Sequence, residues 1–313
     1  MTEASTIFVA GHLGLAGSAI HRALREGGYR NILTRTRADL DLTDRPAVDA
    51  FFAANRPEYV FLAAAKVGGI AANNDYPAEF IYQNLAIQNN VIDSAYRHGV
   101  KKLLFLGSVC IYPKFAEMPI REESLLTAPL EPTNQWYAIA KIAGLMTCQA
   151  YTKQYGWPTI SLMPTNLYGD GDNFSLTSSH VLPALIRKFD DAKTSGASEV
   201  VLWGSGTPRR EFLYVNDLAS ACLFLMRNYD SPDPINVGVD EDISIADLAT
   251  LIQRVVGCDA KIVYDTSKPD GTPRRKMDNS KLKALGWVPS VSLEEGIRKT
   301  YDWYTANRDL IRR

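Results

Sequence analysis

The sequence has no strong charge of either sign and no long apolar run. Its 313 residues include 34 lysines and arginines against 35 aspartates and glutamates, a formal net charge of −1. This balance excludes a generally basic nucleic-acid-binding protein. No apolar run reaches the roughly 18 residues of a membrane-spanning helix, so we expect no membrane partner. The first six residues carry Glu3 and no basic side chain, unlike a signal peptide, which predicts a cytoplasmic protein.

Cysteine is scarce, and its spacing matches neither a zinc motif nor a redox pair. The four cysteines are Cys110, Cys148, Cys222 and Cys258. We therefore expect no metal site and no disulfide framework. Cys148 and Cys222 fall within apolar helical patterns and are expected to lie in the core.

Strand and helix patterns alternate through the first half of the chain. Apolar β-rich runs at 6–10, 32–35, 59–62, 103–106 and 159–163 are separated by helical patterns at 15–26, 45–55, 77–98 and 133–155. This predicts an α/β fold with a Rossmann-type, doubly wound parallel sheet. Beyond Pro164 the alternation breaks, which favours a smaller α/β C-terminal domain. We expect residues 1–170 to form an NADP-binding domain to which 212–240 return, and 171–211 with 241–313 to bind the substrate.

Three glycines, Gly11, Gly14 and Gly17, follow the first predicted strand and open the first predicted helix. Glycine lets the backbone turn tightly and approach a pyrophosphate, and the helix N-terminus then offers free N–H groups. The position of the motif at a strand–helix junction predicts dinucleotide binding rather than a plain turn.

The end of the second predicted strand carries cations instead of the acidic residue typical of NAD proteins. It reads Thr34-Arg35-Thr36-Arg37, which suits the 2′-phosphate of NADP. The alternative is that both arginines are only solvated. Asp41 and Leu42 follow and are candidates for contact with the adenine.

A tyrosine and a lysine share one helix face, at Tyr137 and Lys141. A nearby ammonium stabilises a phenolate, so we expect the pKa of Tyr137 to be lowered. Ser108 ends the preceding sheet strand and brings a hydroxyl to the same crevice. This ordered set predicts proton transfer to or from a carbonyl oxygen.

The sequence leaves the roles of two further residues undecided. Cys110 lies two positions after Ser108, and on an extended segment both side chains would face the same side, toward the substrate. The alternative is a buried, inert thiol. His180 ends a polar loop, 170–179, and is either an acid–base group on a lid or a surface histidine.

Glycine turn, strand-end serine and Tyr-x-x-x-Lys, in that order, resemble the short-chain dehydrogenase/reductase superfamily. The added C-terminal domain resembles its extended, nucleotide-sugar-modifying branch. Several strings together are similar to the GDP-L-fucose synthases, from the glycine turn to the C-terminal helix. These strings cover 63–70 with 72–74, 110–114, 131–134, 163–169, 203–208 with 210–212, and 268–274.

The resemblance implies a homodimer that uses NADP(H) and converts GDP-4-keto-6-deoxy-D-mannose by 3,5-epimerisation and 4-reduction. It implies Ser108, Tyr137 and Lys141 as the reductase triad, and Cys110 with His180 as the epimerisation pair. Lys188, Trp203, Arg210 and Asp270 match GDP-sugar-binding positions. The cofactor positions, from motif and resemblance together, are Gly11, His12, Leu13, Gly14, Leu15, Ala16, Gly17, Arg37, Asp41, Leu42, Leu106, Gly107, Ser108, Val109, Lys141, Pro164, Thr165, Asn166, Leu167 and His180.

The chain departs from the family pattern at two positions. Leu13 replaces a basic residue, which leaves Arg37 more of the 2′-phosphate binding, and Val109 replaces a serine. The alternative function is another NAD(P)-dependent nucleotide-sugar epimerase, dehydratase or reductase. Related dehydratases carry a Thr-Asp-Glu string at the strand end, whereas Ser108-Val109-Cys110 has no carboxylate. A non-enzymatic scaffold would be expected to have a broken triad, and this triad is intact.

Overall fold

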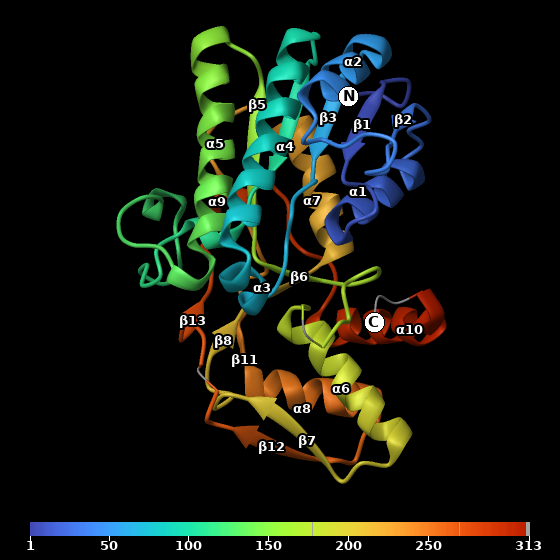
Figure 1. Cartoon of the computed structure of the whole chain (residues 1–313), viewed down its shortest axis with the longest axis vertical. Coiled ribbons are helices and arrows are strands. Elements are labelled where there is room, and N and C mark those ends of the chain that lie inside the picture. The colour runs from blue at the N-terminus through green and yellow to red at the C-terminus, as the bar shows by residue number, and fades with distance from the viewer. Residues whose placement is uncertain (177, 269, 311–313) are drawn as a thin grey trace.

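A parallel sheet forms the centre of the larger part of the molecule (Figure 1). The computed structural model describes residues 1–176, 178–268 and 270–310. Thr177 of the polar loop and Pro269 of the C-terminal motif lie outside the described residues. The strand order is β10–β5–β4–β3–β1–β2, all parallel, which confirms the predicted doubly wound sheet. The strands are β1 (Ile7–Ala10), β2 (Ile32–Leu33), β3 (Tyr59–Leu62), β4 (Lys102–Leu106), β5 (Thr159–Pro164) and β10 (Ile235–Val237).

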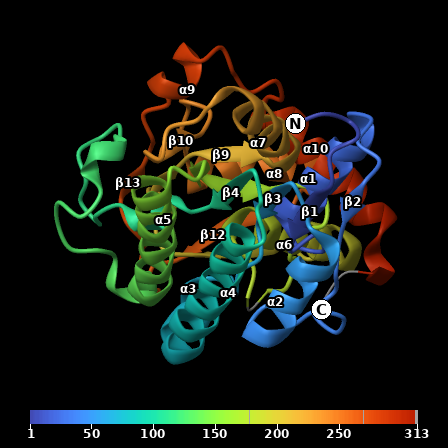
Figure 2. The same cartoon turned by 90° about the horizontal axis from the view of Figure 1, so that it is seen from above.

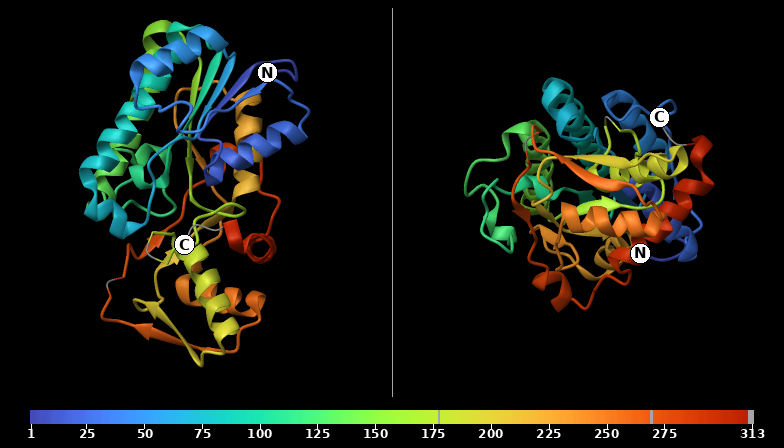
Figure 3. Two further views of the ribbon diagram at one scale, coloured as in Figure 1. Left: turned by 45° about the vertical axis from the view of Figure 1, so that its right-hand side comes forward. Right: turned by 90° about the horizontal axis from the view of Figure 1, so that it is seen from below.

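Both faces of this sheet are apolar because helices cover both. Alternate residues point to opposite faces. Phe8 and Val60 pack with one helix layer, and Ile7 and Phe61 pack with the other. The two layers lie on opposite sides of the strands (Figure 3), and α4 lies beside α5 (Figure 2). One layer is α2 (Arg45–Asn55), α4 (Pro77–Arg97) and α5 (Gln135–Tyr155), and the other is α1 (Leu15–Glu26) and α7 (Val215–Asn228).

A smaller lobe with its own apolar core lies below the carboxyl ends of the strands (Figure 1). Phe189, Leu202, Ile252 and Ile297 belong to this core. Its helices are α6 (Val181–Ser195), α8 (Ile245–Val256) and α10 (Leu293–Ala306). Its strands are β7 (Glu199–Trp203), β8 (Arg209–Arg210), β11 (Ile243–Ser244), β12 (Lys261–Asp265) and β13 (Arg274–Arg275).

The chain crosses between the two lobes more than once. After β6 (Asn166–Tyr168) it enters the smaller lobe, and it returns through β9 (Phe212–Tyr214), which pairs with β6. Beyond α9 (Ser280–Ala284), Trp287 joins the apolar core that α1 and α7 share. The buried carboxylate of Glu211 accepts hydrogen bonds from the backbone N–H groups of Val239, Asp240 and Met277 at 2.6, 2.9 and 3.0 Å. The division into two domains remains a prediction.

Short elements account for the main differences from the predicted secondary structure. The second strand ends at Leu33 instead of residue 35. The helix α3 (Ile70–Asp75) and the 3-10 helices Val109–Ile111, Glu122–Ser124, Pro132–Asn134 and Arg308–Leu310 were not predicted. A single turn carries too few residues to show a helical period. None of the described helices combines the length and the apolar character needed to cross a membrane.

Candidate active site

The turn after β1 is so tight that only glycine fits at two positions. Gly11 has a φ of +89°, and a Cβ there would lie 2.7 Å from the backbone N and Cα of Ala64. A Cβ on Gly17 would lie 2.1 Å from the carbonyl oxygen of Gly11. Gly14 is the N-cap of α1, and among the described residues no side chain caps that end. The amide groups of the first helical turn remain free for an anion, so the turn fits the pyrophosphate of a dinucleotide.

The other side chains of this turn supply no permanent cation. The Leu13 side chain lies at the surface, 64% exposed. The His12 ring lies 6.2 Å from that of His21, and burial lowers the pKa of both histidines. Leu15 and Ala16 start the helix and pack partly against the core. A permanent cation for the 2′-phosphate of the cofactor would therefore have to come from another element.

Arg37 follows the end of β2 and is an exposed cation. Its side chain is 74% exposed, and its Nε lies 3.7 Å from Oδ2 of Asp41. The Arg35 guanidinium instead lies 5.3 Å from the ring centroid of Phe51. Hydrogen bonds from Thr43 lower the pKa of Asp41, which keeps this carboxylate charged. Arg37 is thus held only by a surface ion pair with Asp41, which an anionic ligand could compete for, whereas Arg35 packs against Phe51.

Lys141 joins the catalytic helix to the end of a central strand. Its Nζ donates to the carbonyl oxygen of Leu106 at 2.8 Å, and the side chain is buried. The same Nζ lies 4.9 Å from the ring centroid of Phe105 and 5.7 Å from that of Tyr137. The i, i+4 spacing therefore brings the ammonium over the tyrosine ring, as the helix pattern predicts.

The predicted lowering of the tyrosine pKa is wrong for the chain by itself. Burial raises the pKa of Tyr137, because desolvation disfavours the phenolate, and a charge on Cys110 would raise it further. Burial also lowers the pKa of Lys141 to about 8. The Lys141 ammonium is bonded to Leu106 and is itself destabilised by burial, so it does not offset the desolvation of the phenolate. Tyr137 is therefore a neutral phenol at neutral pH and can donate a proton.

Cys110 lies beside Ser108, but not because the segment is extended. The predicted extended geometry is wrong, since Val109–Ile111 form a 3-10 helix with Ser108 at its N-cap. The Ser108 hydroxyl oxygen accepts a hydrogen bond from the backbone N–H of Cys110 at 3.3 Å, and the hydroxyl also interacts with the thiol. The short 3-10 helix therefore brings the Cys110 sulfur next to the Ser108 hydroxyl.

The thiol of Cys110 is buried and interacts with three of the other candidate catalytic groups, Ser108, Tyr137 and Lys141, but in the described part of the chain no contact joins it to His180. Cys110 is 6% exposed. Burial raises the pKa of this thiol, and the Ser108 hydroxyl and the charges of Arg275 and Lys141 oppose that rise. The structure therefore brings together Ser108, Cys110, Tyr137 and Lys141 in one site, as the sequence predicts.

The strand ends beside this site are closely packed. A Cβ on Gly107 would lie 2.4 Å from Sδ of Met163, so a larger residue there would displace the end of the Met163 side chain. Thr165 Oγ1 and Asn166 Nδ2 donate to the carbonyl oxygen of Glu211 at 3.2 and 2.9 Å. Because Thr165 Oγ1 and Asn166 Nδ2 are bonded within the protein, a cofactor would contact this segment through its other atoms. Pro164 and Leu167 flank them, and Leu42 and Val109 pack against the α2–α4–α5 core.

His180 is the N-cap of α6, at the end of the polar loop. The residue is exposed, yet desolvation by the protein around its ring lowers the pKa of the imidazole. The loop before it is attached to the segment that follows β3, where the N–H of Gly69 donates to the carbonyl oxygen of Ser178 at 3.2 Å. A Cβ on Gly69 would lie 3.1 Å from the carbonyl oxygen of Ser179. This attachment fixes the start of α6, and with it the place of His180.

The predicted GDP-sugar-binding residues lie on the smaller lobe, and two of them form one aromatic–cation group. Trp203 is 66% exposed at the end of β7. The Nζ atoms of Lys188 and Lys268 lie 5.6 and 5.7 Å from the tryptophan ring centroid. Lys188 Nζ also donates to the carbonyl oxygen of Val201 at 2.9 Å. An exposed aromatic ring between two ammonium groups can stack on a base or a sugar.

Arg210 and Asp270 lie next to this group. Asp270 accepts hydrogen bonds from the backbone N–H and the hydroxyl of Ser205 at 2.9 and 2.7 Å, so it holds the loop after β7. A Cβ on Gly271, beside Asp270, would lie 3.0 Å from Nη2 of Arg210. Burial lowers the pKa of Arg210 to about 10, and in the described part of the chain this guanidinium has no ion pair. A half-buried cation without a carboxylate partner is suited to a phosphate.

One residue of the site was not predicted in its observed role. The sequence indicates Arg275 only as part of a basic run, 274–276, that could bind the substrate diphosphate or lie on a wet surface. In the structure its side chain is buried and its Nη1 donates to the carbonyl oxygen of Val109 at 3.0 Å. The two residues are 166 positions apart, so no local spacing pattern could have related them.

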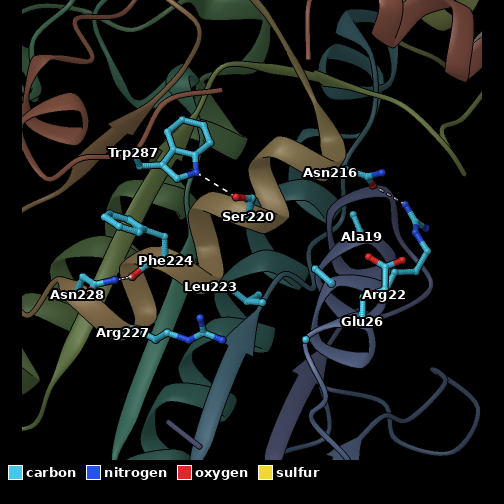
Figure 4. A pocket seen from close by; sticks show the side chains of 12 residues that line it. Ala19, Arg22, Glu26, Asn216, Ser220, Leu223, Phe224, Arg227, Asn228 and Trp287 are labelled. Atoms are coloured by element: carbon cyan, nitrogen blue, oxygen red, sulfur yellow. Dashed lines mark hydrogen bonds between the residues drawn. The ribbon is translucent and has the colours of Figure 1, made fainter. Parts of the chain in front are cut away.

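An open groove of about 500 Å³ lies elsewhere, between α1 and α7 (Figure 4). Arg22, Glu26, Asn216 and Arg227 line it, and Trp287 donates from Nε1 to Ser220 Oγ at 3.2 Å. None of its lining residues belongs to the predicted site, so the groove is not the active site.

Known proteins match this chain over nearly its whole length. Residues 7–238 match the NAD dependent epimerase/dehydratase family. The chain is 61% identical over 305 residues to GDP-L-fucose synthase 1 of Arabidopsis thaliana, covering 97% of this chain and 94% of that relative. It is 51% identical over 315 residues to the GDP-L-fucose synthase of Escherichia coli (strain K12), covering 98% of each. The chain belongs to the GDP-L-fucose synthases of this family.

A solved structure of this family carries the cofactor that the sequence predicts. The GDP-L-fucose synthetase from Naegleria fowleri bound to NADP superposes with a TM-score of 0.93 at 33% identity, over 100% of this chain and 98% of that chain. Family membership confirms the resemblance on which the predicted roles depend. The individual site residues remain predictions, which the geometry above makes specific.

Proposed function

We propose that the protein converts GDP-4-keto-6-deoxy-D-mannose to GDP-L-fucose by 3,5-epimerisation and NADPH-dependent 4-reduction. One observation carries the proposal: a thiol, Cys110, is enclosed with Ser108, Tyr137 and Lys141. Plain carbonyl reduction has no need of a thiol, whereas epimerisation beside a ketone needs a group that removes a proton from carbon. Full-length identity to named synthases supports the same assignment.

The epimerisation uses the acidity of the two C–H bonds that flank the 4-ketone. In this proposal Cys110, as thiolate, removes the proton from C3 or C5, and His180 returns a proton to the opposite face. Ser108 and Tyr137 donate hydrogen bonds to the 4-oxygen, on which negative charge develops. Donors of this kind are worth about 3–4 kcal/mol in enzymes from which one has been removed.

The reduction uses the same carbonyl group. NADPH, when bound, supplies the hydride that the carbonyl carbon accepts. The glycine turn of Gly11, Gly14 and Gly17 would bind its pyrophosphate, and Arg37 its 2′-phosphate. Tyr137 is a neutral phenol, so it gives its proton to the 4-oxygen, and Lys141 holds the helix that carries it.

The GDP-sugar would bind mainly to the smaller lobe. Trp203 offers an exposed ring for the base or the sugar, with Lys188 beside it. Arg210 would pair with the diphosphate, and Asp270 would hold the loop between them through Ser205. The nearly neutral chain needs such local cations, because its overall charge gives an anionic substrate no attraction.

The decisive experiment incubates the protein with GDP-4-keto-6-deoxymannose and NADPH, follows the nicotinamide absorbance band, and identifies the product stereochemistry by NMR. We expect GDP-L-fucose, and deuterium at C3 and C5 when the reaction is run in deuterated water. Cys110→Ser is expected to lose nearly all of this exchange, whereas Cys148→Ser, a buried cysteine remote from the proposed chemistry, retains it. A product without inversion at C3 and C5 would point to another nucleotide-sugar reductase, and undiminished exchange in Cys110→Ser would exclude this thiol as the base.

We also propose that the protein is a homodimer formed through α4 and α5. Its proposed residence in the cytoplasm rests on the family resemblance alone. The two packed helices expose Tyr82, Trp136, Ile139 and Met146, at 70%, 40%, 39% and 37% exposure. An apolar patch of this kind supports an interface with a second copy. Light scattering after size exclusion is expected to give twice the chain mass for the wild type and for Val288→Glu, a change at an exposed site next to Trp287. Ile139→Glu is expected to give monomers, and an unchanged dimer would exclude this face.

A further inference from the structure

Arg275 reaches the turn that carries Cys110 from the far end of the chain. It lies on β13, which pairs in parallel with β8, and is opposite Arg210 in that register. The residue is only 9% exposed, and its Nη1 donates to the carbonyl oxygen of Val109 at 3.0 Å. This oxygen belongs to the peptide bond that joins Val109 to Cys110. A buried permanent cation is therefore bonded directly to the backbone of the thiol.

The groups that face the thiol come from several elements. Ser108 belongs to the same turn, Tyr137 and Lys141 come from α5, and Arg275 comes from β13. Of these, Lys141 and Arg275 carry positive charge, and Tyr137 is neutral. Burial lowers the pKa of Lys141 to about 8, so its charge is partly lost as the pH rises. Burial lowers the pKa of Arg275 as well, but a guanidinium, unlike an ammonium, keeps its charge in proteins throughout that range.

No carboxylate neutralises Arg275 by direct contact. In the described residues Arg275 has no ion pair, and the acidic group that influences it is Glu131. Glu131 is itself paired with Lys114 at 3.1 Å and accepts a hydrogen bond from Thr272 at 3.3 Å. The field of Arg275 is therefore available to an anion on its other side, and the sulfur of Cys110 is the group there that can become one.

We propose that Arg275 is a positioning residue that fixes the Val109–Cys110 peptide and stabilises the thiolate of Cys110. The inference rests on the proposed function, in which that thiolate removes the protons. The step is a simple ionisation: the S–H bond breaks, the electron pair stays on sulfur, and the proton leaves to solvent. Since a buried thiol is otherwise harder to ionise, the charge of Arg275 supplies the activation that the base requires.

The test measures thiol ionisation without turnover. The rate of alkylation of Cys110 by iodoacetamide is followed against pH, with peptide mass spectrometry to separate Cys110 from the other three cysteines. Only the thiolate reacts, so the midpoint of the rate–pH curve reports the ionisation of Cys110. Arg275→Gln is expected to move this midpoint to higher pH by about one unit. Alkylation would then be about tenfold slower than in the wild type below the midpoint, and equally fast well above it. Arg275→Lys, which keeps the charge, is expected to restore the wild-type midpoint.

Arg274→Gln is the matched control on the same strand. Arg274 is half-exposed and paired with Asp242, so the wild-type profile is expected. Glu131→Gln removes the acidic neighbour of Arg275 and is expected to lower the midpoint, which tests the proposal even if Arg275→Gln does not fold. An Arg275→Gln profile that overlays the wild type, or a rate reduced equally at every pH, would overturn the proposal. The alkylation profiles do not depend on whether Cys110→Ser loses deuterium exchange. The exchange experiment therefore tests the proposed function, and the alkylation experiment tests the role of Arg275.

Discussion

The ammonium group of Lys141 lies 2.8 Å from the carbonyl oxygen of Leu106, to which it donates a hydrogen bond. The bond ties α5 to the last residue of β4, one helical turn after Tyr137. Because Ser108 follows Leu106 by two positions, the same bond connects the helix that carries Tyr137 to the strand end that carries Ser108. One buried lysine therefore joins the two elements that supply the proposed donors to the 4-oxygen of the substrate.

This buried lysine gives the fold a pH dependence of known sign. The pKa of Lys141 is lowered from 10.5 to about 8, so between these values the unfolded chain binds more protons than the folded one. Stability therefore rises with pH across this window, by roughly 3 kcal/mol for a shift of this size. We expect urea unfolding to show this gain in Cys110→Ser and not in Cys110→Ser/Lys141→Met. The shared Cys110→Ser change removes the thiol, whose raised pKa contributes the opposite slope. Parallel profiles would mean that Lys141 is not neutralised in the fold.

Removal of the phenol hydroxyl should separate reduction from epimerisation. In Tyr137→Phe we expect NADPH oxidation to fall by about 10²–10⁴-fold, because the proton donor to the 4-oxygen is lost. Deuterium exchange should fall less, since Ser108 still donates to the same oxygen. Both rates are measured on one sample by absorbance and NMR. Wild-type NADPH oxidation in this variant would remove the tyrosine from the reduction.

The pH profile of C–H exchange should be bell-shaped with a low plateau. The proposed base is the thiolate of Cys110, whose thiol pKa is raised by burial, and the proposed acid is the imidazolium of His180, whose pKa is lowered by burial. Between the two values most molecules carry thiol and neutral imidazole, so the reactive form is a minority. We expect the acid limb to coincide with an NMR titration of His180 below pH 6.5. A His180 midpoint above 6.5 would contradict this assignment.

Arg37 should decide between the two nicotinamide cofactors. We expect Arg37→Ser to weaken NADPH binding by roughly ten- to hundredfold, the value of one charge-assisted hydrogen bond, and to leave NADH binding nearly unchanged. Arg35→Ser is the control, because that guanidinium packs over Phe51. Calorimetric titration with both cofactors gives the comparison. Equal losses for NADPH and NADH would show that Arg37 does not contact the 2′-phosphate.

The sheet and the placement of Lys141 beside Tyr137 were predictable because their signals are local. The strand runs are continuous and apolar, and the Tyr137–Lys141 spacing needs only one helix turn. The 3-10 helix of Val109–Ile111 was missed, since three residues show no period, and it changes the reason why Cys110 lies beside Ser108.

Contacts between distant segments could not be predicted in this way. Arg275 lies on a strand of two residues that exists only because it pairs with β8, so neither the strand nor its burial has a signature in the chain. The pKa of Tyr137 was also mispredicted, because spacing reports the nearby ammonium but not the desolvation that outweighs it.

The carboxylate of Glu211 bears on how this protein could be re-engineered. It accepts backbone N–H groups on both sides of α8, from the segment after β10 and from the segment after β13, and an amide N–H of Asn279 at 3.3 Å. A graft of the smaller lobe from a relative would have to recreate every one of these acceptor contacts at once. Specificity swaps in this scaffold should therefore be attempted by exchanging individual side chains, not whole modules.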